Sequence, residues 1–116
     1  MGPMMTYQGI AQMVESIGLP CAYSHFEDDT AKAPPFICWI YPNSADFYAD
    51  NSNYQTIELV QLELYTDKKD IEKEAAVESV LSSYGISWAK NSGYLDDEQM
   101  NMATWQFDVV ITPEPN

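Results

Sequence analysis

Two stretches of the chain place apolar residues at the spacing of an amphipathic helix. The first has an apolar stripe at i, i+3, i+4 and i+7, formed by Ile10, Met13, Val14 and Ile17. Thr6 is a suitable N-cap in front of this stripe, and Gly18 followed by Pro20 favours an end to the helix behind it. The pattern therefore predicts a short helix after Thr6.

The second helical stripe is formed by Val77, Val80, Leu81 and Tyr84. Asp67 or Asp70 can cap its start, and Glu72 and Glu74 suit the positive end of a helix dipole. Gly85 is placed to end the helix.

Between the two helical stripes the pattern changes to that of strands. Residues 21–26 alternate loosely, and residues 36–41 are apolar at every position, which is typical of an interior strand. Residues 54–66 alternate as one long strand, but the phase changes within it: Val60, Leu62 and Leu64 share one face, and Ile57 and Leu59 the other. A phase change requires an extra residue, so we expect a bulge or bend near Leu59-Val60.

The last part of the chain predicts a hairpin. Ile86 and Trp88 share a face, residues 91–98 have the composition of a turn, and residues 99–112 return as a strand. The inward side of that strand would carry Ala103, Trp105, Phe107, Val109 and Ile111.

The element order is thus α-β-β-β-α-β-β, and we expect an α+β domain: an antiparallel β-sheet with two helices packed on one face. The single domain would span residues 6–112. Residues 1–5 would form a flexible N-terminus or a cloning remnant, and residues 113–116 a tail in which proline cannot extend the sheet.

Charge restricts the partners that this domain can have. The 116 residues include 18 acidic and 5 basic side chains, a formal net charge of -13. Such a surface repels phosphate backbones and anionic lipid, so we expect neither specific DNA binding nor membrane binding. It fits a basic partner, a like-charged assembly set by shape, or a surface that keeps nucleic acid at a distance.

The residues offer no motif for catalysis, and we expect a protein that is not an enzyme. The chain has no phosphate-binding glycine loop and no zinc motif, so neither a cofactor nor a metal is predicted. His25 could pair with Cys38, but a hydrogen-bonded or surface histidine is the commoner arrangement. The acidic triplets 27–29 and 96–98 lack the ligand spacing of a calcium loop, and the lysines at 68, 69 and 73 alternate with acids.

The best candidate for a functional segment is a loop with aromatic residues at its centre. Residues 43–53 are rich in Asn, Asp, Ser and Ala, which indicates a loop, and aromatic residues in a loop must fold back or contact a partner. The predicted interaction residues are Asp46, Phe47, Tyr48, Asp50, Asn51 and Tyr54.

The segment Tyr41-Pro-Asn-Ser-Ala-Asp-Phe-Tyr-Ala-Asp-Asn-Ser-Asn-Tyr-Gln55, with Leu62-Glu-Leu-Tyr-Thr66 and Lys69-Asp70, resembles a family of small phage tail proteins. These are tail-completion and head-to-tail joining (neck, minor tail) proteins of long-tailed phages and prophages of Gram-positive bacteria. The resemblance implies a non-enzymatic structural subunit of the virion tail or neck, present in the host cytoplasm before assembly. It also implies a ring, possibly a hexamer, of copies of this chain, which contacts tail-tube and connector proteins while DNA passes through.

Charge alone supports a second class of function equally well. An acidic inhibitor or DNA mimic would block the basic groove of another protein with carboxylates at phosphate-like spacing. Such a protein should stay monomeric or dimeric, whereas a tail-completion protein should form a ring.

Overall fold

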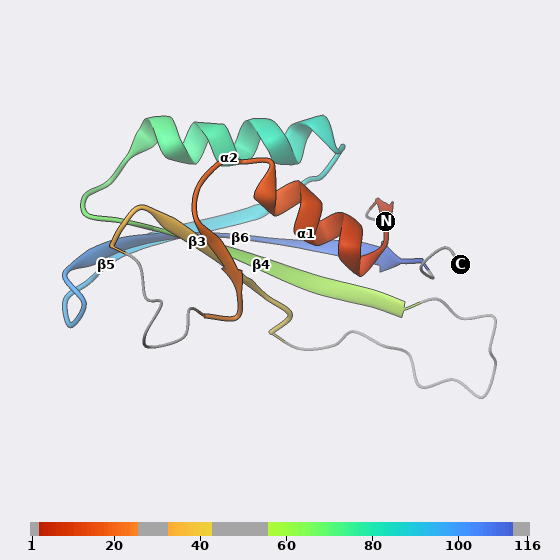
Figure 1. Ribbon diagram of the computed structural model, residues 1–116, viewed down its shortest axis with the longest axis horizontal. Helices are drawn as coiled ribbons and strands as arrows, with labels where there is room; N and C mark the ends of the chain where they lie inside the picture. Colours follow the sequence, from red (N-terminus) through yellow and green to blue (C-terminus); the bar gives the residue numbers. More distant parts are fainter. Residues whose placement is uncertain (1–2, 26–32, 43–55, 113–116) are drawn as a thin grey trace.

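The computed structural model describes residues 3–25, 33–42 and 56–112, which form one sheet with two helices on the same face (Figure 1). The elements in chain order are β1 (Met4–Met5), α1 (Tyr7–Glu15), β2 (Cys21–Tyr23), β3 (Phe36–Ile40), β4 (Thr56–Thr66), α2 (Ile71–Ser83), β5 (Ala89–Leu95) and β6 (Met100–Ile111). β4 and β6 pair along their length at the centre. β3 and then β2 follow on the β4 side, while β5 and β1 both pair with the outer side of β6.

The sheet is mixed, which corrects the expectation of a purely antiparallel one. β2 pairs with β3 in parallel, and β1 pairs with the end of β6 in parallel. Residues 24–35 lie between β2 and β3, and a connection of about a dozen residues is long enough for a parallel return. The antiparallel direction expected for β2 is therefore wrong.

β1 also changes the element order, because the sequence pattern places residues 1–5 outside the domain. The backbone N–H of Val110 donates to Pro3 O at 2.9 Å, and that of Thr112 donates to Met5 O at 2.9 Å. Met5 packs against the core. Two residues are too few to show an alternating pattern, so this strand had no signal in the sequence.

Both predicted helices are confirmed, together with their caps. Thr6 Oγ1 accepts a hydrogen bond from the N–H of Gly9 at 2.8 Å, and Asp70 Oδ1 accepts one from Lys73 N–H at 3.1 Å. Gly85 has a φ of 73°, a conformation that favours glycine, just after α2 ends. Local hydrogen bonds of this kind depend on few residues, which is why the sequence predicts them well.

The core lies between the two helices and the face of the sheet that they cover. It contains the predicted stripes of both helices, except Tyr84, which is 40% exposed, and the inward residues of β3, β4 and β6. Its largest fully buried side chains are Trp105, Ile10, Met13, Ile37, Leu62, Leu64 and Leu81. No helix in the described part of the chain is long and apolar enough to cross a membrane.

The bulge expected near Leu59-Val60 is absent, because β4 pairs with β6 in one unbroken register from Thr56 to Thr66. The apparent change of phase has another cause. Glu58 occupies a core-facing position in line with Val60, and it is 7% exposed. The Tyr7 hydroxyl donates to Glu58 Oε2 at 2.6 Å, so a buried carboxylate replaces the apolar residue that the pattern requires.

The turn predicted at residues 91–98 is also wrong in extent. Residues 89–95 form β5, and only residues 96–99 turn before β6 begins. Six of the seven β5 residues are exposed, so this strand can form without apolar side chains. Its Asn-Ser-Gly sequence has the composition of a turn, which is why the sequence predicts a turn here.

Candidate functional site

All six predicted interaction residues lie outside the described residues. The segment that carries them follows Pro42 and precedes Thr56, so it connects β3 to β4. The described structure therefore leaves that prediction untested, and the surfaces described below belong to residues 3–25, 33–42 and 56–112.

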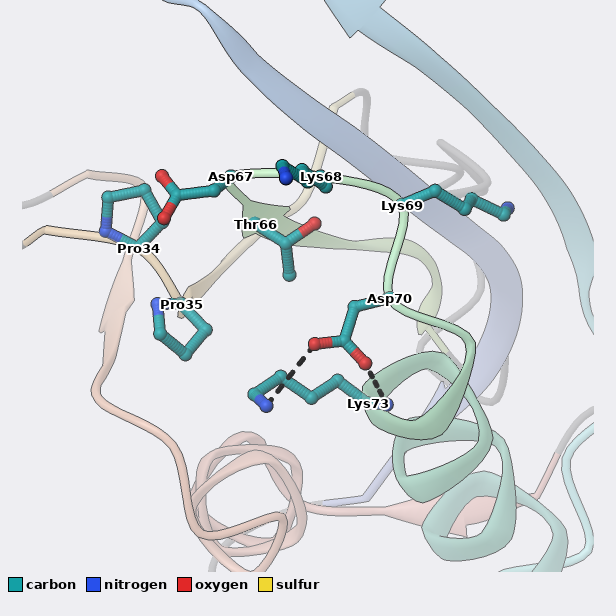
Figure 2. Close-up of a pocket in the computed structure, with 8 residues that line it drawn as sticks. All are labelled: Pro34, Pro35, Thr66, Asp67, Lys68, Lys69, Asp70 and Lys73. Carbon is teal, nitrogen blue, oxygen red and sulfur yellow. Dashed lines mark hydrogen bonds and ion pairs between the residues drawn. The ribbon is translucent and has the colours of Figure 1, made fainter.

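A cleft at the start of α2 is lined by several charged side chains (Figure 2). Its volume is about 270 Å³, and it is lined by Pro34, Pro35, Thr66, Asp67, Lys68, Lys69, Asp70 and Lys73. Because it includes three lysines beside a helix N-terminus, it is the natural place to test for anion binding.

Charged side chains of this cleft instead cap α2 and form ion pairs with residues of that helix. Asp70 caps α2 and also pairs with Lys73 Nζ at 3.2 Å, and the backbone hydrogen bond from Lys73 lowers the pKa of Asp70. In Figure 2 the Lys69 side chain extends away from the prolines, and its Nζ lies 3.0 Å from Glu74 Oε1. Asp70, an acid of this chain, thus already caps the N-terminus of α2. Among the described residues, the cleft therefore provides a structural cap for the helix and not an anion site.

Ion pairs connect α2 to β5. Glu74 is 3% exposed, and its Oε1 lies 3.0 Å from Lys69 Nζ and 2.9 Å from Lys90 Nζ. Lys90 Nζ is also 2.6 Å from Glu78 Oε2, and Trp105 Nε1 donates to the same oxygen at 3.1 Å. The charges of two glutamates and two lysines therefore balance, and the ion pairs of Lys90 hold β5 against α2.

The pKa values of Glu78 and Lys90 agree with a structural role for these ion pairs. Burial is the largest influence on the pKa of Glu78 and raises it, but hydrogen bonds from Lys90 and Trp105 outweigh burial and leave it below its ordinary value. The hydrogen bond to Glu78, together with Glu74, raises the pKa of Lys90. Both groups are stabilised in their charged forms, the opposite of what a proton-transfer site near neutral pH needs.

The face of the sheet opposite the helices, here called the open face, carries a row of linked polar side chains. Neither α1 nor α2 covers it (Figure 1). Gln106 Nε2 donates to Gln61 Oε1 at 2.6 Å, and Gln61 Nε2 donates to Glu63 Oε2 at 2.7 Å. The Tyr65 hydroxyl donates to Glu63 Oε1 at 2.9 Å, and its ring stacks on Phe36 at 4.8 Å. This ordered, half-buried surface suits contact with a protein.

The open face contains no activated nucleophile. Cys38 lies on it beside Glu63 in the pairing of β3 with β4, and burial followed by the charge of Glu63 raises its pKa to about 11. Burial and Glu63 also raise the pKa of Tyr65. Cys21 pairs with Ile37 and not with Cys38, so the two thiols lie on opposite faces, and both are free. His25 is exposed beside Ser24, with Nδ1 at 3.0 Å from its Oγ.

Tyrosines gather on the other face, near the ends of β2 and β3. Tyr41 contacts both Tyr7 and Tyr23 with ring centroids 5.4 Å apart, and Tyr23 contacts Trp39 at 5.8 Å. Tyr7 and Tyr23 are 42% and 53% exposed. Tyr41 comes just before residues 43–55 in the chain, so the cluster is adjacent in sequence to the segment that carries the predicted interaction residues.

No known protein family and no curated protein matches the sequence. Solved structures do match in three dimensions. A chain from the structure of the virion of a native gene transfer agent (GTA) particle superimposes with a TM-score of 0.57 at 12% identity. The match covers 88% of this chain and 85% of that chain. The two chains share a fold.

Among the described residues, no three histidine, cysteine, aspartate or glutamate side chains are close enough to hold a metal ion. What the described surfaces offer is contact: the open face, the tyrosine cluster and the free edge of β5. The sequence pattern predicts none of these three surfaces. A signal for the cluster was present in the aromatic residues at 7, 23, 39 and 41.

Proposed function

We propose that the protein is a structural component of a phage-like virion, a ring-forming tail-completion or head-to-tail joining subunit of the tail or neck. It acts without catalysis and without a cofactor. Its partners are other copies of itself and the tail-tube and connector proteins.

The observation that carries this proposal is the shared fold with a chain of the GTA virion over 88% of the sequence. The printed sequence provides independent support, because residues 41–55 and 62–66 resemble small tail proteins. A fold can host unrelated functions, so the surfaces have to agree with the assignment.

The surfaces agree in two respects. The open face and the tyrosine cluster lie on opposite sides of the sheet, so one subunit can contact two different neighbours, as a heterologous ring requires. The net charge of -13 opposes adhesion to DNA that passes through a ring.

Mass spectrometry of particles purified from the organism that encodes the chain tests the proposal. The chain should be present at the low copy number of one closed ring, and negative-stain images of the purified oligomer should show rings. Absence of the chain from particles would overturn the virion role. A copy number that rises with tail length would overturn the ring role.

The same experiment separates the acidic-inhibitor alternative. An inhibitor or DNA mimic is absent from particles and blocks a nuclease or another DNA-binding enzyme when added in stoichiometric amounts. Inhibition of such an enzyme combined with absence from particles would replace the proposed function with the alternative.

A further inference from the structure

β5 is the longest strand with a free edge in the described sheet. Its only partner there is β6, whereas the other strands at the edges of the sheet, β1 and β2, have two and three residues. All β5 residues except Leu95 are exposed. A strand of this kind presents unpaired N–H and C=O groups to any extended chain that approaches it.

The register identifies which backbone groups face this free edge. Val110 and Thr112 of β6 donate outward to the β1 segment, so even-numbered residues of β6 direct their backbone groups to this side. The residues of β5 opposite even-numbered partners are Ala89, Asn91, Gly93 and Leu95, and these face β6. Because backbone direction alternates along a strand, the groups of Lys90, Ser92 and Tyr94 point to the free edge.

The usual protection of an edge strand is missing. β5 contains no proline, and its single charged residue, Lys90, is paired with Glu74 and Glu78 on α2. A lysine that guards an edge has to extend over it, and Lys90 is held on the helix side instead.

The contacts with α2 also hold this edge in place. Lys90 is fixed by the two glutamates, and Ser92 Oγ accepts a hydrogen bond from Lys69 Nζ at 3.3 Å. These are two of the three residues whose backbone groups face outward. A backbone that is already ordered loses less entropy when a strand binds.

A shallow groove runs beside the edge on the open face. Its volume is about 250 Å³, and it is lined by Asn91, Ser92, Gly93, Tyr94, Leu95, Met102 and Thr104. At Gly93 a side chain would meet nothing within 4 Å, so the space above it is open. An added strand could place an apolar side chain there, next to Leu95 and Met102.

Charge and symmetry indicate what occupies the edge. The lysines near β5 are balanced by Glu74 and Glu78, while the turn of Asp96, Asp97 and Glu98 at its end is fully exposed and acidic. Pairing of β5 with β5 of a second copy joins two chains of charge -13 and closes a two-fold dimer, which a ring contact does not do.

We propose that the free edge of β5 binds an extended, basic segment of another protein by strand addition, with one apolar side chain of that segment in the groove over Gly93. This inference rests on the proposed function, which places the partner in the virion. It deepens that function by assigning β5 to a protein other than a second copy of the chain.

The test is a selection from yeast-displayed random peptides of about nine residues, with the full-length protein as bait. Enriched peptides should alternate apolar with polar residues and be rich in Lys and Arg. Binding should slow amide hydrogen exchange of Lys90, Ser92 and Tyr94 in the unmodified protein.

Ser92→Pro is the decisive variant, because proline removes an N–H that points outward and leaves the β5–β6 hydrogen bonds intact. Ser92→Ala is the matched control: it loses the contact with Lys69 but keeps the N–H. Ser92→Pro should bind the selected peptides at least about tenfold more weakly than Ser92→Ala, which is about 1.4 kcal/mol. If Ser92→Pro does not fold, Tyr94→Pro compared with Tyr94→Ala replaces it.

Four results would overturn the proposal: no enrichment, enrichment of acidic peptides, equal binding by the proline and alanine variants, or exchange protection outside β5. Concentration-dependent dimers that Ser92→Pro abolishes would assign the edge to a second copy and overturn it too. None of these results depends on whether the chain is found in particles, so the proposed function can fail or hold separately.

Discussion

Glu58 is a carboxylate in line with the apolar residues Val60, Leu62 and Leu64 of β4. Its Oε2 accepts the hydrogen bond from Tyr7, and its Oε1 is buried with no hydrogen-bond partner. A buried acceptor left without its partner costs about 1–3 kcal/mol, more for a charged group. The Tyr7 hydroxyl is therefore a structural group, although its ring is 42% exposed.

Replacing Tyr7 with Phe should lower the free energy of unfolding by about 1–3 kcal/mol, because Glu58 loses its hydroxyl donor. Urea denaturation followed by Trp fluorescence measures the change. Tyr94→Phe is the control, since Tyr94 is 56% exposed, and it should change stability by less than about 0.5 kcal/mol. Equal stability of Tyr7→Phe and the original protein would contradict the role of this hydrogen bond.

At the scale of elements, the contact between α2 and β5 depends on pH. The pKa of Glu78 is lowered from its ordinary value of 4.5, so its contribution to stability is present above that value and is lost as the pH falls through the lower folded-state pKa. The pKa of Lys90 is raised from 10.5, so its contribution is present below that value and is lost as the pH rises through the higher folded-state pKa. The contact is therefore complete between these limits.

Glu78→Gln should be less stable than the original protein by about 1 kcal/mol at pH 7, because Lys90 loses an ion pair and Trp105 keeps an acceptor. The difference should shrink as the pH falls below 4.5 and through the lowered folded-state pKa of Glu78. Urea denaturation at several pH values measures it. Glu72→Gln, at an exposed position on α2, is the comparison. A difference that stays constant down to pH 3 would rule out the ion pair as its cause.

β1 is a second element whose contribution can be measured. Deleting residues 1–5 removes the acceptors for Val110 and Thr112 and the packing of Met5, so stability should fall by about 1–3 kcal/mol. Deleting only residues 1–2 retains β1 and should leave the unfolding midpoint nearly unchanged. Thermal unfolding of the two truncated proteins makes the comparison, and equal midpoints would show that β1 adds nothing to the fold.

The elements that the sequence predicts well are those determined by neighbours along the chain. Thr6 and Asp70 cap helices by bonds to residues three positions away, and the inward row of β6 follows a simple alternation. The parallel pairing of β2 with β3 and the placement of β1 depend on residues far apart, which no local pattern records. Glu58 misled the pattern because its partner, Tyr7, lies 51 positions away.

For the candidate site too, features set by neighbouring residues were predictable and features set by distant residues were not. The polar row of Gln61, Glu63 and Gln106 has an alternating signal, but its hydrogen bonds require the register between β4 and β6. The edge of β5 had no signal, since Asn-Ser-Gly is typical of turns and only the pairing with β6 makes it a strand. Pairing between strands is thus what the sequence analysis lacked for both surfaces.

At the scale of the whole molecule, charge is the dominant property. With 18 acidic and 5 basic side chains, and the lysines at 69, 73 and 90 engaged in ion pairs, little positive charge is left to meet phosphate. Non-specific DNA binding depends on such contacts and on the release of counterions. The molecule is expected to repel the duplex in any orientation.

The protein should therefore not retard duplex DNA in a gel-shift assay at about 50 mM salt, even at protein concentrations near 100 µM, where non-specific binders are saturated. A basic DNA-binding protein of similar size serves as the positive control on the same gel. Retardation of the duplex that disappears with added salt would reveal a basic surface that the described residues do not contain.

The pairing of β1 with the end of β6 has a consequence for protein engineering. It places the two ends of the folded domain together, since Thr112 N–H donates to Met5 O at 2.9 Å. β6 is 12 residues long, so the turn at residues 96–99 is about 40 Å away from that hydrogen bond along the strand. A fluorescent protein fused at either terminus therefore lies far from that turn, and a short linker between the termini permits circular permutation with new ends at the acidic turn.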